Sequence, residues 1–387
     1  MGLRNQIDRA AALKGELVAY ASGPGFVRLL EAEMLDAAPH TDDPQDAWAT
    51  AVESMIYDRP ERGGKTLIER YLLGHKQLAP EDRVLLEGWR DRALYGVFEV
   101  ASRKGDRLML VNLVDELGYQ TYSTMGAAAI RPVSPGNYVV TRVVPVGDAW
   151  LLSGIQRLFT KRDRTLVGSL VAGLIENDPT GPFRNAAKRE LALEINRTHH
   201  GIFLSLFGAD AVAGTGRDVA EHYRRFIREC NARILADMPE ATDRVGLDAA
   251  PDLADGIFPD DLLAADDVVL LNHPVKGVGF YQNHARVEDA HRAPPSRPKA
   301  QGVRLVRNYL DDETIPAYVL ARLAAAYPDT VDRLYRLVLR RPEFRWESDG
   351  DALLRERKPA WYDTADIPDL MLLPAIAIEA MRDAPKQ

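Results

Sequence analysis

The sequence predicts an α+β protein that is mainly helical, with a small five-stranded SH3-like or OB-like β-barrel inserted and a short second β segment. Two patterns in the spacing of apolar residues predict this class. Helical spacing recurs over residues 1–92 and 163–238, whereas five β-rich runs separated by turn residues fall between residues 94 and 153. Hydrophobic residues make up 46% and charged residues 27% of the 387 residues, as in ordinary globular proteins.

The helical pattern is clear near the beginning of the chain. Leu13, Leu17 and Tyr20 follow helical spacing, and a Gly-Pro-Gly sequence at residues 23–25 interrupts the pattern before it resumes. A later helix begins at Pro80, because proline suits the first position of a helix, where its missing N–H is not needed. We therefore expect helices throughout the first 92 residues.

The five β-rich runs are short and closely spaced. Turn sequences rich in glycine, such as residues 104–106 and 135–137, separate them. Five strands in about 60 residues are enough to close one small barrel. The runs are residues 95–100, 107–114, 119–122, 138–144 and 149–153.

Residues 293–301 are the best candidate for a linker, because three prolines in nine residues exclude a continuous helix or a central strand. Before it, residues 267–271 and 278–281 predict a strand pair. We expect six segments: an N-terminal helical domain (1–92), the β-barrel (93–156), a helical domain (157–240), a mixed segment with the strand pair (241–292), the linker (293–301) and a C-terminal helical region (302–387).

Composition and charge exclude several classes of protein. The single cysteine, Cys230, cannot form an internal disulfide or a multi-cysteine zinc or iron–sulfur site. A net charge of −8 disfavours attraction of the whole surface to nucleic acid or anionic lipid. No run of about 20 apolar residues occurs, and the first residues lack the apolar core of a signal peptide. We expect a cytosolic protein with no membrane partner.

Seven segments, in this order along the chain, carry a resemblance to a known family: residues 64–72, 78–82, 86–90, 95–100, 142–147, 151–154 and 351–359. Together they resemble a large uncharacterised family of bacterial cytosolic proteins, some members of which carry a SEC-C type zinc motif. The resemblance implies a bacterial cytosolic protein and no particular reaction. This chain has no cysteine cluster, so no zinc site can be carried over from that family.

Two glycine-containing motifs fall short of nucleotide-binding patterns. Residues 63–66 (Gly-Gly-Lys-Thr) resemble the end of a phosphate-binding loop, but Arg59 stands where the full pattern needs glycine. Residues 213–217 lack the third glycine of a dinucleotide fingerprint, since position 219 is Val219. We interpret the first motif as a turn that opens a helix and the second as a helix-breaking loop.

Histidines are the commonest metal ligands, and three of them lie around the expected strand pair. His273, His284 and Asp267, together with Glu288, would suit a metal-assisted hydrolase if they converged, and His291 follows nearby. The alternative is a set of separate surface histidines, and the metal site stays unassigned. No catalytic residue and no cofactor are predicted.

The remaining signal is a basic and aromatic segment at residues 333–362. It holds eight Lys and Arg residues against five acidic residues, so its local charge opposes that of the whole chain. Arg333, Arg336 and Arg340 share one helix face, and five aromatic residues interleave with the cations, a mixture typical of single-strand nucleic-acid binders. The candidate nucleic-acid-binding residues are Arg333, Arg336, Arg340, Arg341, Arg345, Trp346, Arg355, Arg357 and Lys358.

These observations favour a noncatalytic binding protein that contacts nucleic acid, a ribonucleoprotein or another protein through this basic and aromatic face. The alternative for the face itself is a solvated helix surface, or one whose arginines pair with acidic residues of another domain. The alternatives for the whole protein are the metal-assisted hydrolase and a structural or regulatory subunit of a protein complex.

Overall fold

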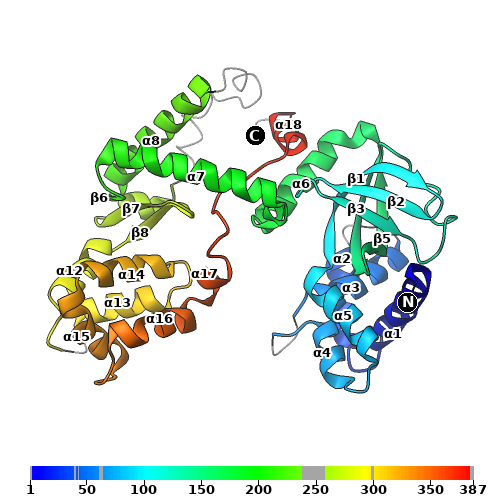
Figure 1. Cartoon of the computed structure of the whole chain (residues 1–387), viewed down its shortest axis with the longest axis horizontal. Helices are drawn as coiled ribbons and strands as arrows, with labels where there is room; N and C mark the ends of the chain where they lie inside the picture. Colours follow the sequence, from blue (N-terminus) through cyan, green and yellow to red (C-terminus); the bar gives the residue numbers. More distant parts are fainter. Residues whose placement is uncertain are drawn as a thin grey trace. The chain divides into compact units, whose positions relative to one another are not determined.

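The structure is a computed structural model that describes residues 2–38, 41, 43–60, 64–237, 258–297 and 300–383. Contacts within the chain divide it into two compact units. Unit 1 comprises Met1–Asn185 and Leu372–Gln387, and unit 2 comprises Ala186–Met371. The expected N-terminal helical domain and the expected β-barrel therefore lie in the same unit (Figure 1).

Unit 1 begins with five helices, as the apolar spacing of the first 92 residues predicts. Asp43 caps α3 by accepting a hydrogen bond from the backbone N–H of Gln45 at 2.8 Å. Thr66 and Glu69 form a capping box at the start of α4, so the Gly-Gly-Lys-Thr sequence opens a helix as interpreted. The helices are α1 (Leu3–Ala21), α2 (Val27–Ala37), α3 (Pro44–Tyr57), α4 (Leu67–Gly74) and α5 (Pro80–Arg92).

Five strands follow and form one mixed sheet, sheet A, in which each strand has two neighbours. β1 pairs with β2 and β4, β3 pairs with β2 and β5, and β5 pairs with β4; only the β3–β5 pairing is parallel. The prediction of five strands in this part of the chain is confirmed, and β1 and β5 extend beyond the predicted ends. The strands are β1 (Leu94–Lys104), β2 (Arg107–Asn112), β3 (Gly118–Tyr122), β4 (Tyr138–Val146) and β5 (Ala149–Phe159).

The helices of unit 1 and sheet A share hydrophobic cores. Trp89 of α5 is fully buried, and its indole N–H donates to the carbonyl of Pro145 in β4 at 2.9 Å. A second core lies between the sheet and α6 (Arg164–Asn177), where α18 (Ala375–Asp383) also packs. A Cβ at Gly168 would lie 2.2 Å from the carbonyl oxygen of Ile376, so only glycine allows α6 and α18 to approach this closely. Two short helices, η2 (Lys161–Asp163) and η3 (Gly181–Arg184), flank α6.

Unit 2 contains a second sheet, sheet B, with the strand order β6-β7-β8. β7 and β8 confirm the predicted strand pair. The interpretation of residues 213–217 as a loop is wrong in part, because Ala213 and Gly214 belong to β6 and pair with β7. Alanine and glycine have low strand propensity, so β6 depends on its neighbour rather than on its own sequence. The elements here are α7 (Ala186–Phe207), β6 (Ala211–Gly214), α8 (Gly216–Asp237), α11 (Asp260–Ala264), β7 (Val268–His273) and β8 (Gly277–Gln282).

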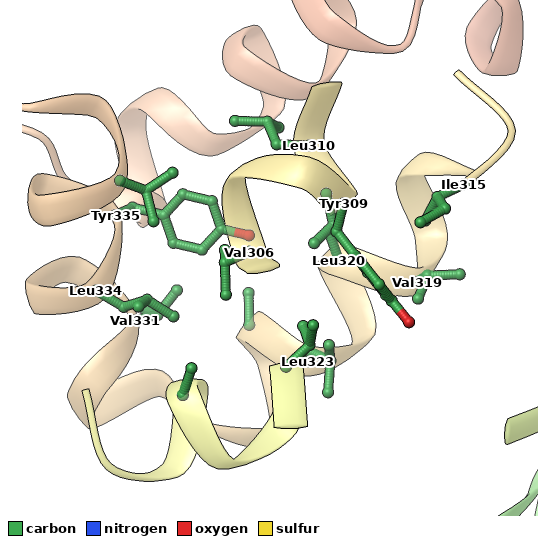
Figure 2. Close-up of a cluster of buried hydrophobic side chains, with 14 of the residues drawn as sticks. Val306, Tyr309, Leu310, Ile315, Val319, Leu320, Leu323, Val331, Leu334 and Tyr335 are labelled. Carbon is green, nitrogen blue, oxygen red and sulfur yellow. The ribbon is translucent and has the colours of Figure 1, made fainter. Parts of the chain in front are cut away.

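Further helices complete the described part of unit 2 and enclose its largest hydrophobic core. Figure 2 shows the buried side chains of α13, α14 and α15 pointing toward one another, among them Val306, Leu320 and Tyr335. The sequence patterns did not single out α12 or α13. The helices are α12 (His284–Arg292), α13 (Gln301–Asp311), α14 (Ala317–Ala326), α15 (Pro328–Leu339), α16 (Trp346–Arg357) and α17 (Pro359–Asp363).

Parts of several sequence interpretations lie outside the described residues. They include Gly63 of the glycine motif, residues 238–240 of the helical domain, residues 241–257 of the mixed segment, and residues 298–299 of the linker. Within the described residues, none of the helices combines the length and the apolar character needed to cross a bilayer.

Candidate functional site

The predicted basic residues lie on α15, on α16 and in the loop that joins these helices, and several of them bond within the fold. Arg336 donates through Nε to the carbonyl of Phe344 at 2.9 Å and also pairs with Asp332 at 3.3 Å. Arg355 pairs with Asp351 at 2.8 Å, four residues earlier on α16. The guanidinium groups of Arg336 and Arg355 therefore already have partners in the chain.

Two more predicted cations hold α16 against α13. Arg357 pairs with Asp311 at 2.8 Å. Lys358 is only 3% exposed, and its Nζ donates to the carbonyl of Tyr309 at 2.8 Å and to the carbonyl of Asp312. Both carbonyls lie at the end of α13, where helical carbonyls lack helical partners, and burial lowers the pKa of Lys358. Lys358 is thus a buried structural contact.

The aromatic residues of the segment pack inward. Tyr335 and Phe344 are buried in the main core of unit 2, and the ring of Trp346 lies 4.5 Å from that of Tyr335. Trp361 and Tyr362 also pack against this core and receive cations on their rings, from Lys276 and Arg355 respectively. These rings contribute to packing and do not form an open stacking platform.

Four predicted arginines are both exposed and, within the part of the chain that the structure describes, unpaired: Arg333, Arg340, Arg341 and Arg345. Among the described residues, no hydrogen bond or ion pair engages their guanidinium groups. Arg340 and Arg341 follow the end of α15 and line a cavity of about 340 Å³, which we call the arginine hollow. Its charged lining residues are Arg307, Arg340, Arg341, Arg357 and Asp311, so the lining carries a net charge of +3.

The backbone at the arginine hollow is unusual. Arg340 ends α15 in the left-handed conformation with φ of 57°, a position where helices most often have glycine. A non-glycine residue in this conformation lowers the stability of the fold by about 1 kcal/mol or more. At the same helix end, the guanidinium of Arg307 donates to the carbonyl of Val338, which is one of the last carbonyls of α15. Arg307 thereby stabilises the helix end that carries Arg340.

Hydrogen bonds within the fold engage three residues of the hydrolase alternative: Asp267, His273 and Glu288. Nδ1 of His273 accepts two backbone hydrogen bonds in the β7–β8 turn, and Asp267 accepts two from the start of α12. Glu288 accepts from Tyr327 at 2.6 Å, while His284 and His291 are buried on α12 with the pKa of each lowered by burial. Within the described ranges, no three His, Cys, Asp or Glu side chains converge as metal ligands.

Cys230 lies in a hydrophobic cluster of α7, α8 and sheet B, beside Phe203 and Phe226. It is 2% exposed, and burial raises the pKa of its thiol to about 12. A thiol that stays protonated is a poor nucleophile, so Cys230 serves packing.

A polar cavity in unit 1 has no counterpart among the sites predicted from the sequence. We call it the Glu53 cavity; it has a volume of about 390 Å³ and lies between α3 and sheet A. Tyr95 of β1 pairs across the sheet with Arg142 of β4, which pairs with Ser153 of β5, so these three side chains share one face. Thr50 and Glu53 face them from α3, one turn apart.

Glu53 is the centre of a buried charge network. Its carboxylate lies 2.5 Å from Nζ of Lys14 and 3.4 Å from Nε of Arg142, and it accepts a hydrogen bond from Ser153 at 3.1 Å. Arg142 also pairs with Asp58. Although burial lowers the pKa of Lys14, its neighbours, Glu53 among them, raise that pKa above the ordinary value. Lys14 therefore keeps its charge.

A distortion of sheet A shapes the wall of the Glu53 cavity. Val140 pairs with Arg157, and the next pair is Arg142 with Ser153, so β5 has two more residues than β4 between these pairs. Such a bulge redirects side chains. Gly154, within the bulge, has φ of +70°, and a Cβ there would lie 2.7 Å from Cγ of Glu53.

The sequence contained one signal for the Glu53 cavity. Arg142 lies in a strand whose residues are otherwise mostly apolar, and all nine residues of that strand are buried. A charged residue in such a strand needs a buried partner. The partners are Glu53 of α3 and Asp58, the residue after α3, and both are distant in sequence from Arg142, so spacing alone could not identify them.

Residues 32–180 match the model of a family of unknown function (DUF7986). The expectation of an uncharacterised family is thus confirmed for this part of the chain. All the residues that line the Glu53 cavity lie within the matched range, and none of those that line the arginine hollow does. No curated protein and no solved structure matches the chain.

Proposed function

We propose that the protein is a noncatalytic binding protein that contacts the phosphate backbone of nucleic acid, free or in a ribonucleoprotein, through unit 2. The contact residues are four of the nine candidates named from the sequence. The observation that carries the proposal is the set of exposed guanidinium groups that have no partner among the described residues. They belong to Arg333, Arg340, Arg341 and Arg345.

The neighbouring acidic residues support this proposal. Asp311, Asp332 and Asp351 could neutralise the free arginines, but each already pairs with another arginine. Asp349 accepts hydrogen bonds from the backbone N–H of Arg345 and from Ser348, and the charges of Arg341 and Arg345 act on it without forming an ion pair. Arg340 and Arg341, which line the arginine hollow, are thus two cations side by side that stay unpaired in the described part of a chain with 57 acidic and 49 basic residues. The guanidinium group binds phosphate oxygens in a bidentate manner, so a phosphate supplies the missing counter-charge.

The conformation of Arg340 gives a second argument. Glycine at this helix end would avoid the strain of the left-handed backbone. A residue that lowers stability where glycine is easily accommodated points to a role of its side chain outside the fold. We therefore infer that the long cationic side chain of Arg340 contacts the phosphate of the ligand.

We also propose that sheet A is an OB-like rather than an SH3-like barrel. The order β4-β1-β2-β3 is that of a Greek key, and the OB-fold is a five-stranded Greek-key barrel used by many nucleic-acid-binding proteins. A bacterial, cytoplasmic role is part of the proposal and follows from the family resemblance of the sequence. Fold likeness alone does not assign function, so the arginine hollow is the part to test.

The test is fluorescence anisotropy with a labelled oligomer of about 20 uridylates, longer than the binding site of a typical single-strand-binding fold. The full chain is compared with the double variant Arg340→Gly and Arg341→Gln. A matched control, Arg197→Gln with Arg355→Gln, removes the same charge from exposed arginines that are already paired with acids.

We expect the double variant to weaken binding about tenfold while the control stays within about twofold of the wild type. Arg340→Gly relieves backbone strain, so the variant keeps its fold and a loss of binding cannot be attributed to unfolding. An equal loss of affinity in both double variants would mean that only the net charge of the protein matters, and would contradict the proposal. Failure of the wild-type protein to bind the oligomer would also contradict it.

A further inference from the structure

The Glu53 cavity has the features of a small-molecule site. Its volume of about 390 Å³ falls in the range of natural ligand cavities, and its wall combines apolar residues with a few polar groups. The apolar part is formed by Ala37, Val140 and Ile155. The proposal for unit 2 does not involve this cavity, which lies in unit 1.

The buried charges around the cavity are costly for the fold. Arg142 is only 5% exposed, and the Glu53 side chain is 12% exposed. A buried ion pair is often no more stabilising than well-packed apolar residues of similar size, because both ions lose their hydration. Charges kept beside an open cavity are therefore typical of sites that bind or position a ligand.

One cation in the wall has no partner among the described residues. Lys14 and Arg142 together neutralise Glu53 and Asp58, which leaves Arg157 as the excess charge. Arg157 is half-buried, and within the described part of the chain no hydrogen bond or ion pair engages its guanidinium group. The cluster as a whole thus carries a net charge of +1.

Two further donors belong to side chains that line the cavity, and both lack a firm acceptor within the residues that the structure describes. Nε of Arg142 is buried and has no hydrogen-bond acceptor with suitable geometry among the described residues. Tyr95 lines the same wall, and burial raises the pKa of its phenol although Arg157 and Arg142 oppose the change. The phenol therefore stays protonated and can donate a hydrogen bond.

We propose that the Glu53 cavity binds a small organic molecule with a single anionic group, which Arg157 pairs, and with an apolar body against Val140 and Ile155. The carboxylates of Glu53 and Asp58 in the same wall repel any further anionic group of a ligand. This excludes a polyanion such as nucleic acid and separates the site from the arginine hollow. The anionic group is a carboxylate or a phosphate monoester.

The experiment uses the full chain and three probes of similar shape: benzoate, phenyl phosphate and the uncharged benzamide. Binding is measured by ligand-detected NMR titration and by the rise in Tm that a ligand of the folded state causes. Benzoate and phenyl phosphate distinguish the two anionic groups, while benzamide tests whether the charge is needed.

Arg157→Gln removes the excess cation, and Arg162→Gln is the matched control. Arg162 is exposed just after β5, does not line the cavity and has no side-chain partner among the described residues. We expect at least one anionic probe to bind about tenfold more tightly than benzamide, and Arg157→Gln to abolish that preference. The Arg162→Gln variant should bind like the wild type.

Three outcomes would overturn the assignment. Equal binding of benzamide and the anions would show that charge is not recognised. Unchanged anion binding by Arg157→Gln would place the anion elsewhere. Absence of binding by both anionic probes would remove the site. None of these outcomes bears on uridylate binding by unit 2, so each of the two proposals can be contradicted without affecting the other.

Discussion

Gly154 is the residue on which the shape of the Glu53 cavity depends most directly. Its φ of +70° is unfavourable for other residues, and a Cβ there would also collide with Glu53. Gly105 is a matched control, because it has φ of +65° and a Cβ added to it would meet no atom within 4 Å. The two glycines differ mainly in the collision.

We predict that Gly105→Ala lowers the free energy of unfolding by about 1 kcal/mol and Gly154→Ala by about 2 kcal/mol or more. The additional loss reflects displacement of the Glu53 carboxylate. Urea unfolding measures both values. Equal losses in the two variants would mean that Glu53 moves aside at no cost and that the network around it is not rigid.

Lys358 is predicted to act on stability alone. Lys358→Met leaves two carbonyls at the end of α13 without their donor and should lower the free energy of unfolding by about 1–3 kcal/mol. Arg355→Gln breaks an exposed ion pair and the contact of Arg355 with the ring of Tyr362, and should lower the free energy of unfolding by less than about 1 kcal/mol. Chemical denaturation compares the two, and a smaller loss for Lys358→Met than for Arg355→Gln would contradict the structural role.

At the scale of elements, one ion pair connects α1 with α5. Arg9 donates to both carboxylate oxygens of Asp82, at 2.8 and 2.5 Å, and the side chain of Asp82 is 10% exposed. The hydrogen bonds from Arg9 hold the pKa of Asp82 below its ordinary value. The charged carboxylate therefore favours the folded state.

We predict that Asp82→Asn lowers the free energy of unfolding by about 1–2 kcal/mol at pH 7. Because the folded-state pKa is depressed, this contribution is complete above the unfolded-state pKa of about 4 and is lost as the pH falls through the folded-state pKa. The free energies of unfolding of the wild type and of the Asp82→Asn variant should become equal in acid. Asp91→Asn, at an exposed pair with Arg90, is the control, and a difference that persists at the lowest pH would contradict the assignment.

The elements differ in how well the sequence predicted them. Strands β1 to β5 were predicted because alternating apolar residues and glycine turns mark each of them locally. β6 was missed because its four residues have weak strand propensity and depend on pairing with β7. α12 and α13 were not singled out, since they lie next to the strand pair and the proline-rich segment, whose local signals are stronger.

The candidate sites were predictable to a different extent. Local charge identified the arginines of α15 and the loop after it, but not which of them bond within the fold. Arg336 and Lys358 bind backbone carbonyls of other segments, which no sequence pattern reveals. The lining of the Glu53 cavity combines residues of α2, α3 and three strands, so only the tertiary structure brings Glu53 and Arg142 together.

At the scale of the whole molecule, the chain leaves unit 1 at residue 185 and returns to it at residue 372. The returning segment contains α18, which buries Ile376, Ala377 and Ala380 in a core with α6. Unit 2 is continuous in sequence and has its own hydrophobic cores, so we predict that it unfolds as a separate cooperative unit.

Removal of residues 372–387 should lower the stability of unit 1 by about 3 kcal/mol or more, because the buried face of α18 is lost. The transition of unit 2 should stay unchanged. Differential scanning calorimetry of the full and shortened chains measures both transitions. A single transition that shifts as a whole would contradict the division into independently stable units.

The measurement that tests the central claim most directly is the salt dependence of uridylate binding. Each phosphate contact on a single strand contributes about 0.7 to the slope of log K against log salt concentration. We predict a linear decrease for the wild type and a slope smaller by about 1.4 for the variant with Arg340→Gly and Arg341→Gln. An unchanged slope in that variant would show that the arginine hollow does not bind phosphate.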